Sequence, residues 1–265
     1  MSLISDSHGN IYGHNKRLQI LLPLLSPQDI IVEFGCGTGY MITLPLLRLG
    51  YDAIGVDMDA PSIEYGRNVL REEGLPEDRL RCIDLRDLDL QPDCIIASEV
   101  LEHIPDDELE GVVAMLTSKL NTGGTLLITV PNGYGWFEAE SWLWNSMTIG
   151  RLLERLRIVN AIIEMKKRIG IWDHAEMFST LSSSPHVQRF TMSRICLLLE
   201  RHGLRIEQRT GTVFFCGPFS HLFFSGVRPV TAFNLWLGSL LPDWAAGFIV
   251  VCRKPGELAS QRIAP

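Results

Sequence analysis

Short apolar runs alternate with stretches of helical periodicity over the first half of the chain. Each run is bounded by Gly, Pro or Asp, which is typical of strands buried on both faces of a parallel sheet. The runs cover residues 29–34, 52–57, 78–84, 93–100 and 125–130. The stretches between them predict helices over residues 38–49, 60–73 and 106–120. This alternation of strand and helix predicts an α/β fold with a doubly wound, Rossmann-like, mostly parallel sheet.

The alternation stops after the fifth apolar run. A Trp-rich and then amphipathic helical stretch covers residues 136–169, a helix is predicted over 191–202 with Gly203 ending it, and strands are predicted near 204–215 and 248–253. We therefore expect one domain over residues 1–265. It would have a helical lead or lid at 1–28 and a helical insertion at 132–190, which caps the carboxyl ends of the strands, where such sheets bind ligands.

Composition narrows the class of protein. The 265 residues are 46% hydrophobic with a net charge of −7, so the chain can form a large core, and its acidic balance argues against a nucleic-acid partner. Six cysteines without a C-x-x-C pair and an amino terminus without a secretory pattern favour reduced thiols in the cytoplasm.

The first strand runs directly into a glycine-rich turn with the spacing G-x-G-x-G. Gly35 and Gly37 would let the backbone approach a ligand, and the free amides of the next helix would favour an anionic group. Tyr40 stands where a dinucleotide fingerprint has its third glycine, which argues against NAD. A tight turn without a ligand is the alternative.

Acidic residues end the next two strands. Asp57 is placed to accept hydrogen bonds from ribose hydroxyls, Met58 to pack on an adenine face, and Asp84 to accept from an exocyclic amine. Each acid alone is as easily a surface residue at a strand end. Their order after the glycine turn predicts a nucleoside pocket.

The ordered motifs VEFGCGTG, GVDMD, CIDL, IIASEVLEHI and GGTLLITVPN resemble those of class I S-adenosylmethionine-dependent methyltransferases, in particular the ubiquinone-biosynthesis O-methyltransferase-like group. The resemblance implies a seven-stranded sheet with an antiparallel strand at its edge. It also implies cofactor-binding residues: Glu33, Gly35, Cys36, Gly37 and Gly39 around the methionine part, Asp57 and Met58 at the ribose and adenine, Asp84 and Leu85 at the adenine edge, and Ser98 beneath the sulfonium. S-adenosylmethionine has no phosphate, and no Lys or Arg lies between Asp29 and Leu47.

The segment after Ser98 carries the candidate chemistry. Glu99, Glu102 and His103 share one face of a helical turn, so His103 would act as a general base oriented by a carboxylate, or the three would ligate a metal. This E-x-x-E-H spacing resembles that of ubiquinone O-methyltransferases and of small-RNA 2′-O-methyltransferases, where a later His completes a divalent site. His186 holds a comparable place, and the ligand set suits Mg²⁺ or Mn²⁺. The alternative is that Glu102 and His103 only brace the loop.

The sequence does not identify the molecule that accepts the methyl group. Tyr12, His14 and Arg17 precede the first strand, where relatives close a lid over the cofactor; the alternative is a surface helix without a role in binding. Aromatic residues follow the fifth strand, near an acceptor site or in core packing (Tyr134, Trp136, Trp142 and Trp144). The basic insertion forms a solvated helix face or, with the apolar stretch 214–241, docks peripherally on a membrane.

We expect O-methylation of a small or lipid-like molecule. The alternatives are metal-dependent RNA 2′-O-methylation, an NAD(P)-dependent oxidoreductase, and a binder of the cofactor without activity. The sequence does not determine the oligomeric state.

Overall fold

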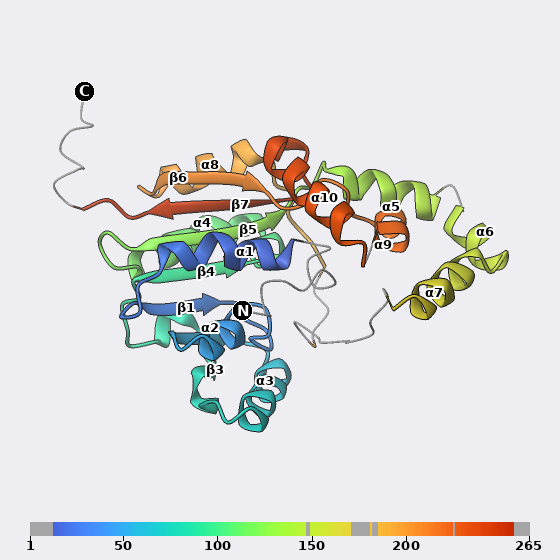
Figure 1. Cartoon of the computed structure of the whole chain (residues 1–265). Coiled ribbons are helices and arrows are strands. Elements are labelled where there is room, and N and C mark those ends of the chain that lie inside the picture. The colour runs from blue at the N-terminus through green and yellow to red at the C-terminus, as the bar shows by residue number, and fades with distance from the viewer. Residues whose placement is uncertain (1–12, 147–148, 171–180, 182–184, 225, 257–265) are drawn as a thin grey trace.

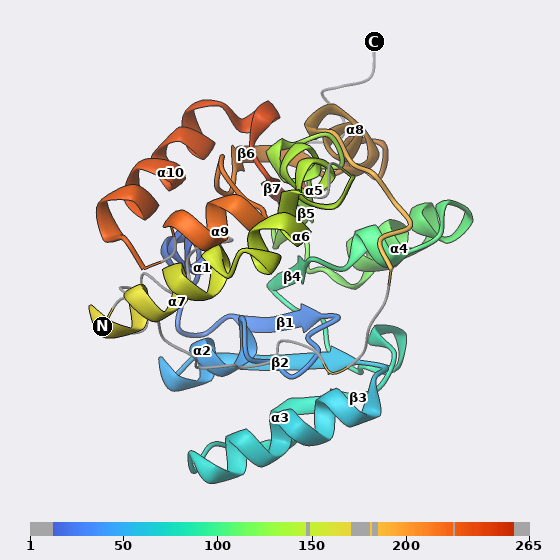
Figure 2. The same cartoon turned by 90° about the vertical axis from the view of Figure 1, so that its right-hand side faces the viewer.

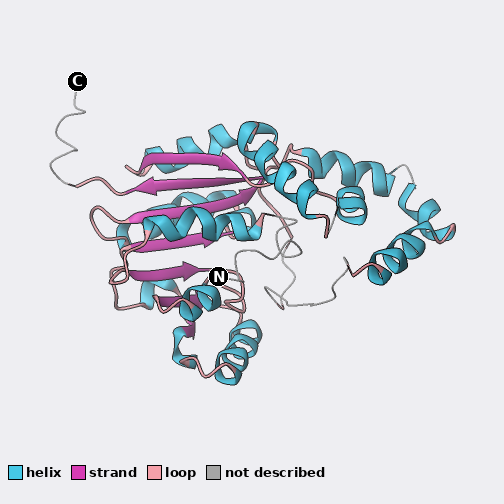
Figure 3. Ribbon diagram, in the orientation of Figure 1, coloured by secondary structure: helices cyan, strands magenta, loops and turns pink. Residues whose placement is uncertain are grey.

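One sheet organises the part of the chain that the computed structural model describes, residues 13–146, 149–170, 181, 185–224 and 226–256 (Figures 1 and 3). Its order is β3-β2-β1-β4-β5-β7-β6. The strands are β1 (Ile30–Phe34), β2 (Asp52–Asp57), β3 (Leu80–Cys82), β4 (Cys94–Ser98), β5 (Thr125–Pro131), β6 (Arg205–Gly211) and β7 (Gly247–Arg253). Only β7 is antiparallel to its neighbours in this sheet. The predicted fold class, with its seven mostly parallel strands, is confirmed.

Helices cover both faces of the sheet, which explains why its inner strands are continuously apolar. The α-helices are α1 (His14–Leu21), α2 (Thr43–Arg48), α3 (Ala60–Glu72), α4 (Asp106–Lys119), α5 (Trp136–Ser146), α6 (Ile149–Arg155), α7 (Ile158–Arg168), α8 (Met192–Arg201), α9 (Pro218–Phe224) and α10 (Arg228–Leu240). The 3₁₀ turns are η2 (Leu22–Leu24), η3 (Glu77–Arg79), η4 (Leu85–Asp87), η5 (Leu101–His103) and η6 (Pro242–Trp244). One core cluster joins the sheet to α4 and α8, and the other joins it to α1, α2 and α3.

Local signals placed most helix ends well. The side chains of Asp59 and Thr191 accept from backbone amides at the starts of α3 and α8, and Gly203 follows α8 with a φ of 76°. The helix predicted over 38–49 is wrong in its start, because α2 begins only at Thr43. Gly39 has a φ of 72°, which no right-handed helix accommodates, so the chain turns until residue 42.

The antiparallel strand lies one position inside the edge of the sheet, not at the edge. β7 is buried along almost its whole length between β5 and β6, whereas the edge strand β6 is mostly exposed. The sequences explain this order, because FIVV can be buried on both faces and RIEQR cannot.

Two helical connections lie beyond the carboxyl ends of the strands (Figures 1 and 2). The expected one follows β5 and contains α5, α6 and α7; its residues 147–148, 171–180 and 182–184 lie outside the described part, as do residues 1–12 of the predicted lead. The second connection, between β6 and β7, contains α9, α10 and η6, where the sequence analysis predicted only an apolar stretch and a strand reaching residue 215. Within the described residues, no helix has the length and apolar character needed to cross a membrane.

Candidate active site

The glycine turn after β1 lies against two other strand ends. Gly35, Gly37 and Gly39 all have positive φ angles, and a Cβ atom on Gly35 would lie 2.6 Å from the side chain of Val100, just after β4. The amide of Gly37 donates to Asp57 Oδ2 at 2.7 Å, so the turn and the end of β2 form one unit. The conformation and the close approach both require glycine here.

Glu33, in β1, is hydrogen-bonded to Thr43, the first residue of α2. Its carboxylate is 4% exposed and accepts from the amide of Thr43 at 2.8 Å and from the Thr43 hydroxyl at 2.5 Å. Burial raises the pKa of Glu33 to about 7, against the opposing effect of these hydrogen bonds. The first amide of α2 is therefore used by Glu33. The amide of Thr43, which the sequence analysis counted among the free amides of this helix, is bonded to a side chain of the protein.

The other predicted cofactor residues differ in what they expose. Met58 is 70% exposed, and Asp57 also accepts from the amide of Asp59 at 2.8 Å. Asp84 accepts from the amide of Arg86 at 2.8 Å. In contrast, the side chains of Cys36 and Leu85 are buried in the core clusters, so only their backbone atoms are placed to meet a ligand.

Four polar side chains form a closed ring of hydrogen bonds at the ends of β4 and β5. Arg17 of α1 donates to Ser98 at 2.7 Å and pairs with Glu99 at 2.9 Å. Thr129 donates to the same Glu99 oxygen at 2.8 Å and lies 3.0 Å from the Ser98 hydroxyl. Because Arg17 only donates and the carboxylate only accepts, Ser98 must donate to Thr129.

The ring fixes an unusual backbone. Glu99 has a φ of 57°, in the left-handed region, and its amide donates to the carbonyl of Thr129 at 2.9 Å. Residues other than glycine adopt this backbone conformation where the surrounding structure imposes it, as at functional sites. Of the residues predicted to form a lid, Arg17 reaches the site, whereas Tyr12 lies outside the described residues. Thr129, a polar residue in an apolar strand, was missed, and that contrast was its only signal in the sequence.

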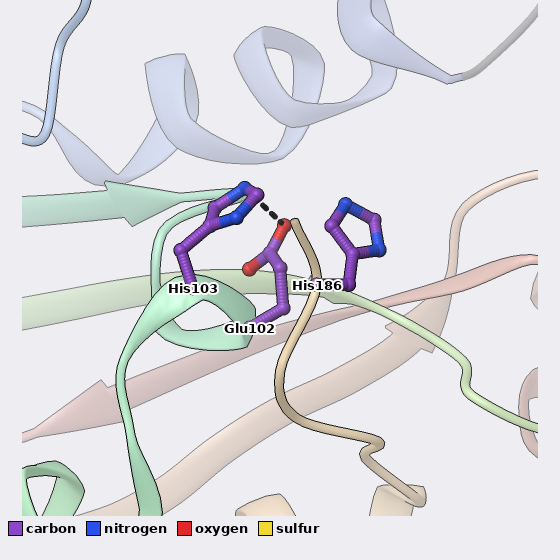
Figure 4. Close-up of side chains that lie close together, drawn as sticks. All are labelled: Glu102, His103 and His186. Carbon is purple, nitrogen blue, oxygen red and sulfur yellow. Dashed lines mark ion pairs between the residues drawn. The ribbon is translucent and has the colours of Figure 1, made fainter. Parts of the chain in front are cut away.

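Glu102, His103 and His186 lie close together beside this ring (Figure 4). Their ligating atoms all lie within 4.8 Å of one another, and the rings of the two histidines are 4.9 Å apart. Two backbone amides, those of Val187 and Gln188, donate to the carbonyl of Glu102 and hold the later segment in place. The sequence prediction that His186 joins this cluster is thus correct in position, while Glu99 turns toward Arg17 and Thr129.

The Glu102 carboxylate is fully buried, and neither of its oxygens has a hydrogen-bond partner. Burial, and next the charge of Glu99, raise the pKa of Glu102 to about 9. His103 Nδ1 lies 3.1 Å from the carbonyl of Pro185, so in neutral His103 this nitrogen carries the proton and donates it. The free Nε2 is then the nitrogen on the side of Glu102, at 3.9 Å. An orphaned carboxylate beside an imidazole lone pair is chemically suited to a cation.

A cavity of about 420 Å³ opens next to the ring. Its lining contains both polar and apolar residues, with contributions from both helical connections. The polar residues include Arg17, Glu99, Asn132, Glu138, His186, Gln188 and Arg189, and the apolar ones Pro131, Phe137, Cys216 and Ala246.

The aromatic residues after β5 serve two roles. Trp136 donates to Glu140 at 2.6 Å and packs on Phe214, and Trp144 packs on Phe219. Tyr134 and Trp142 are exposed. The contacts of Trp136 and Trp144 join the two helical connections, although Trp136 is itself 41% exposed and neither residue belongs to a core cluster.

Comparisons with known proteins agree on one family. A family model described as a methyltransferase domain (Methyltransf_23) matches residues 11–209. The sphingolipid C9-methyltransferase 1 of Gibberella zeae is 27% identical over 124 residues, which cover 45% of this chain and 24% of that protein. The ubiquinone biosynthesis O-methyltransferase of Methylococcus capsulatus is 35% identical over 105 residues, covering 38% of this chain and 43% of that protein. These matches span less than half the length of either relative.

Solved structures share the fold. A SAM-dependent methyltransferase from Methanosarcina mazei superposes with a TM-score of 0.55 at 17% identity, covering 90% of this chain and 98% of that one. Magnesium protoporphyrin IX methyltransferase from Synechocystis PCC 6803, with bound SAH, gives 0.53 at 14% identity, covering 93% and 85%.

Proposed function

This chain belongs to the class I S-adenosylmethionine-dependent methyltransferases, and we propose that it methylates a hydroxyl oxygen of a small or lipid-like acceptor. Membership of the family removes the NAD(P)-dependent oxidoreductase alternative. The observation that carries the proposal is the cavity beside Glu99, whose lining includes polar side chains that can bond a hydroxyl and apolar side chains that can contact a hydrocarbon. Relatives named for sphingolipids, fatty acids and ubiquinone biosynthesis support a lipid-like acceptor.

The residues at the strand ends fit the cofactor. Gly35, Gly37 and Gly39 give the turn the positive φ angles and the small size that allow its backbone to lie close to the methionine part, and the two oxygens of Asp57 suit the ribose diol. Met58 and Asp84 lie further along the same edge, for the adenine. When bound, S-adenosylmethionine supplies a methyl group activated by its sulfonium. In this assignment Glu33 acts indirectly, by holding α2 behind the glycine turn.

We assign Glu99 as the base that takes the proton from the acceptor hydroxyl. It lines the cavity, and both donors to its carboxylate, Arg17 and Thr129, bond to one oxygen, Oε1. That arrangement holds the carboxylate in one orientation before the acceptor arrives. The ring of Arg17, Ser98, Glu99 and Thr129 therefore aligns the base, while the cavity excludes water from the hydroxyl that reacts.

We propose further that Glu102, His103 and His186 hold a divalent ion such as Mg²⁺ or Mn²⁺. The unpartnered carboxylate oxygens and the orientation of His103 support this assignment. Such an ion would polarise an acceptor oxygen as a Lewis acid. Glu99, expected as a fourth ligand, is assigned to the proton instead because its carboxylate already bonds Arg17.

A labelling experiment tests the proposed function. The full chain is incubated with methyl-labelled S-adenosylmethionine and a long-chain alkylphenol, phenol itself, or an RNA with a free 3′-terminal 2′-hydroxyl. We expect an ether on the alkylphenol, with kcat lowered by roughly 100-fold or more in Glu99→Gln. Glu64→Gln, an exposed residue of α3, is the matched control and should leave kcat unchanged. Label only in the RNA, or equal rates for Glu99→Gln and the parent chain, would contradict the proposal.

A further inference from the structure

The helix α10 is amphipathic in the reverse of the usual sense. Thr231, Asn234 and Gly238 face the protein, whereas Phe233 and Trp236 are 52% and 57% exposed. A helix that packs on a soluble domain normally turns its apolar face inward. We call the exposed apolar face of α10 and the turn after it the apolar ridge, and define it by Phe233, Trp236, Leu240, Leu241 and Trp244.

Hydrogen bonds fix this orientation. Asn234 Oδ1 accepts from the amides of Phe214 and Phe215 at 3.1 and 2.7 Å, and its amide group donates to the carbonyl of Phe215 at 2.7 Å. The buried Lys16 of α1 donates to Leu235 O at 3.2 Å and to Ser239 Oγ at 2.7 Å.

Close packing adds to this constraint. A Cβ atom on Gly238 would lie 2.6 Å from the carbonyl oxygen of Thr212. Rolling the helix to bury its aromatic residues would break the hydrogen bonds of Asn234 and Lys16, so the exposure of the apolar ridge is built into the fold.

Helix α10, which carries most of the apolar ridge, lies at the outer margin of the molecule (Figure 2). The rings of Phe233 and Trp236 lie 5.7 Å apart and present one continuous aromatic surface. Phe223 and Phe224 of α9 are exposed as well, at 48% and 36%. A protruding surface rich in Trp, Phe and Leu suits the interfacial region of a bilayer, where aromatic rings meet both hydrocarbon and water.

The helices α6 and α7 carry basic residues, whose charge has the sign that an anionic lipid surface needs. The whole chain carries −7, yet residues 149–168, in α6 and α7, include six basic and two acidic residues. Five of the basic side chains are exposed: Arg151, Arg155, Arg157, Lys167 and Arg168. Helix α7 packs against α9, the helix that precedes α10, so this basic segment lies on the same side of the molecule as the connection that carries the apolar ridge (Figure 2).

We propose that the apolar ridge inserts into the headgroup region of an anionic phospholipid membrane, while the exposed basic residues of α6 and α7 contact lipid phosphates. The connection that carries the apolar ridge also supplies Thr212, Cys216 and Ala246 to the cavity. Docking would therefore bring the cavity close to the lipid surface. This inference concerns binding to a surface and does not depend on methyl transfer.

Vesicle cosedimentation tests the inference with the full chain and no cofactor. We expect it to bind vesicles of phosphatidylcholine with phosphatidylglycerol, and to bind phosphatidylcholine alone more weakly. The double variant Trp236→Ser/Leu240→Ser should bind the mixed vesicles at least about tenfold more weakly, because it removes two exposed apolar side chains. Leu197→Ser is the matched control: Leu197 is 51% exposed on α8, away from the apolar ridge, and its loss should not change binding.

Tryptophan fluorescence and ultracentrifugation distinguish insertion into a bilayer from the pairing of two copies of the chain. Brominated lipids should quench tryptophan fluorescence of the parent chain, and this quenching should fall in the double variant. Equal binding by the double variant and the parent chain would overturn the role of the apolar ridge. So would a lack of vesicle binding together with a dimer, seen by ultracentrifugation, that the double variant abolishes, since the apolar ridge would then meet a second copy.

Discussion

The buried carboxylate of Glu33 makes a quantitative prediction about stability. Burial raises the pKa of Glu33 from 4.5 to about 7, so between these values the folded chain keeps a proton that the unfolded chain releases. The free energy of unfolding therefore falls as pH rises through this window, and the contribution is lost above pH 7. At 1.36 kcal/mol for each pKa unit, the loss is about 3 kcal/mol.

Glu33→Gln isolates this effect. Glutamine resembles the protonated acid and keeps an oxygen that can accept from the amide and hydroxyl of Thr43, but it has no proton to lose. Near pH 4.5 the parent chain and the variant should have similar stability, and by pH 8 the variant should be more stable by about 3 kcal/mol. Because other titrating groups are common to both chains, the difference between them reports Glu33 alone.

Urea denaturation followed by circular dichroism, at intervals from pH 4.5 to 8, measures this difference directly. The slope against urea should be the same for both chains, which would show that only stability has changed. A difference in stability that does not vary with pH would show that Glu33 titrates normally, and the reasoning from its burial would then be wrong. A variant that loses stability relative to the parent as pH rises would refute the sign.

Three further predictions follow from other contacts. Asp57→Asn should weaken S-adenosylmethionine binding by roughly 10- to 100-fold in calorimetry, because the amide offers one acceptor oxygen where the carboxylate offers two. The control Asp52→Asn, at the exposed start of β2, should bind as the parent chain does, and equal affinities of Asp57→Asn and the parent chain would contradict the assignment of Asp57. Mn²⁺ should raise the melting temperature of the parent chain but not that of Glu102→Gln, and without metal the two chains should melt at the same temperature. An equal rise in both chains would show that the ion binds elsewhere. Lys16→Met should lower the free energy of unfolding, measured by urea denaturation, by about 2–4 kcal/mol, because it leaves the carbonyls of Gly211 and Thr212 without their buried donor. A change below about 0.5 kcal/mol would show that these hydrogen bonds contribute little to stability.

Much of the cofactor edge was predictable because its signals are local. Gly35 and Asp57 each sit at the end of a short apolar run, and parallel strands bring their carboxyl ends to one edge of the sheet. The structure then joins them through the bond from Gly37 to Asp57. Glu33 shows the limit of this reasoning, because a strand residue next to a glycine turn can face either the ligand or the core.

The acceptor side of the site was less predictable because its contacts join residues that lie far apart in the sequence. Arg17 and Ser98 meet across 81 positions, and the Pro185 segment next to His186 meets His103 across 82. No periodicity within either segment encodes such a meeting. The resemblance to known families suggested His186, whereas the pairing of Arg17 with Glu99 became visible only once α1 was packed beside β4.

Periodicity along the chain determined the α/β class, the order of strands and helices as far as residue 131, and the glycine turn, since burial of a strand or one face of a helix is a local property of its residues. The tertiary structure decided the rest. It placed β7 inside the edge strand β6, bonded Glu33 to Thr43, closed the ring around Glu99, and set α10 with its polar face inward. Each of these depends on which groups remain available as hydrogen-bond partners after the sheet has formed, and that is a property of the assembled backbone rather than of any one segment.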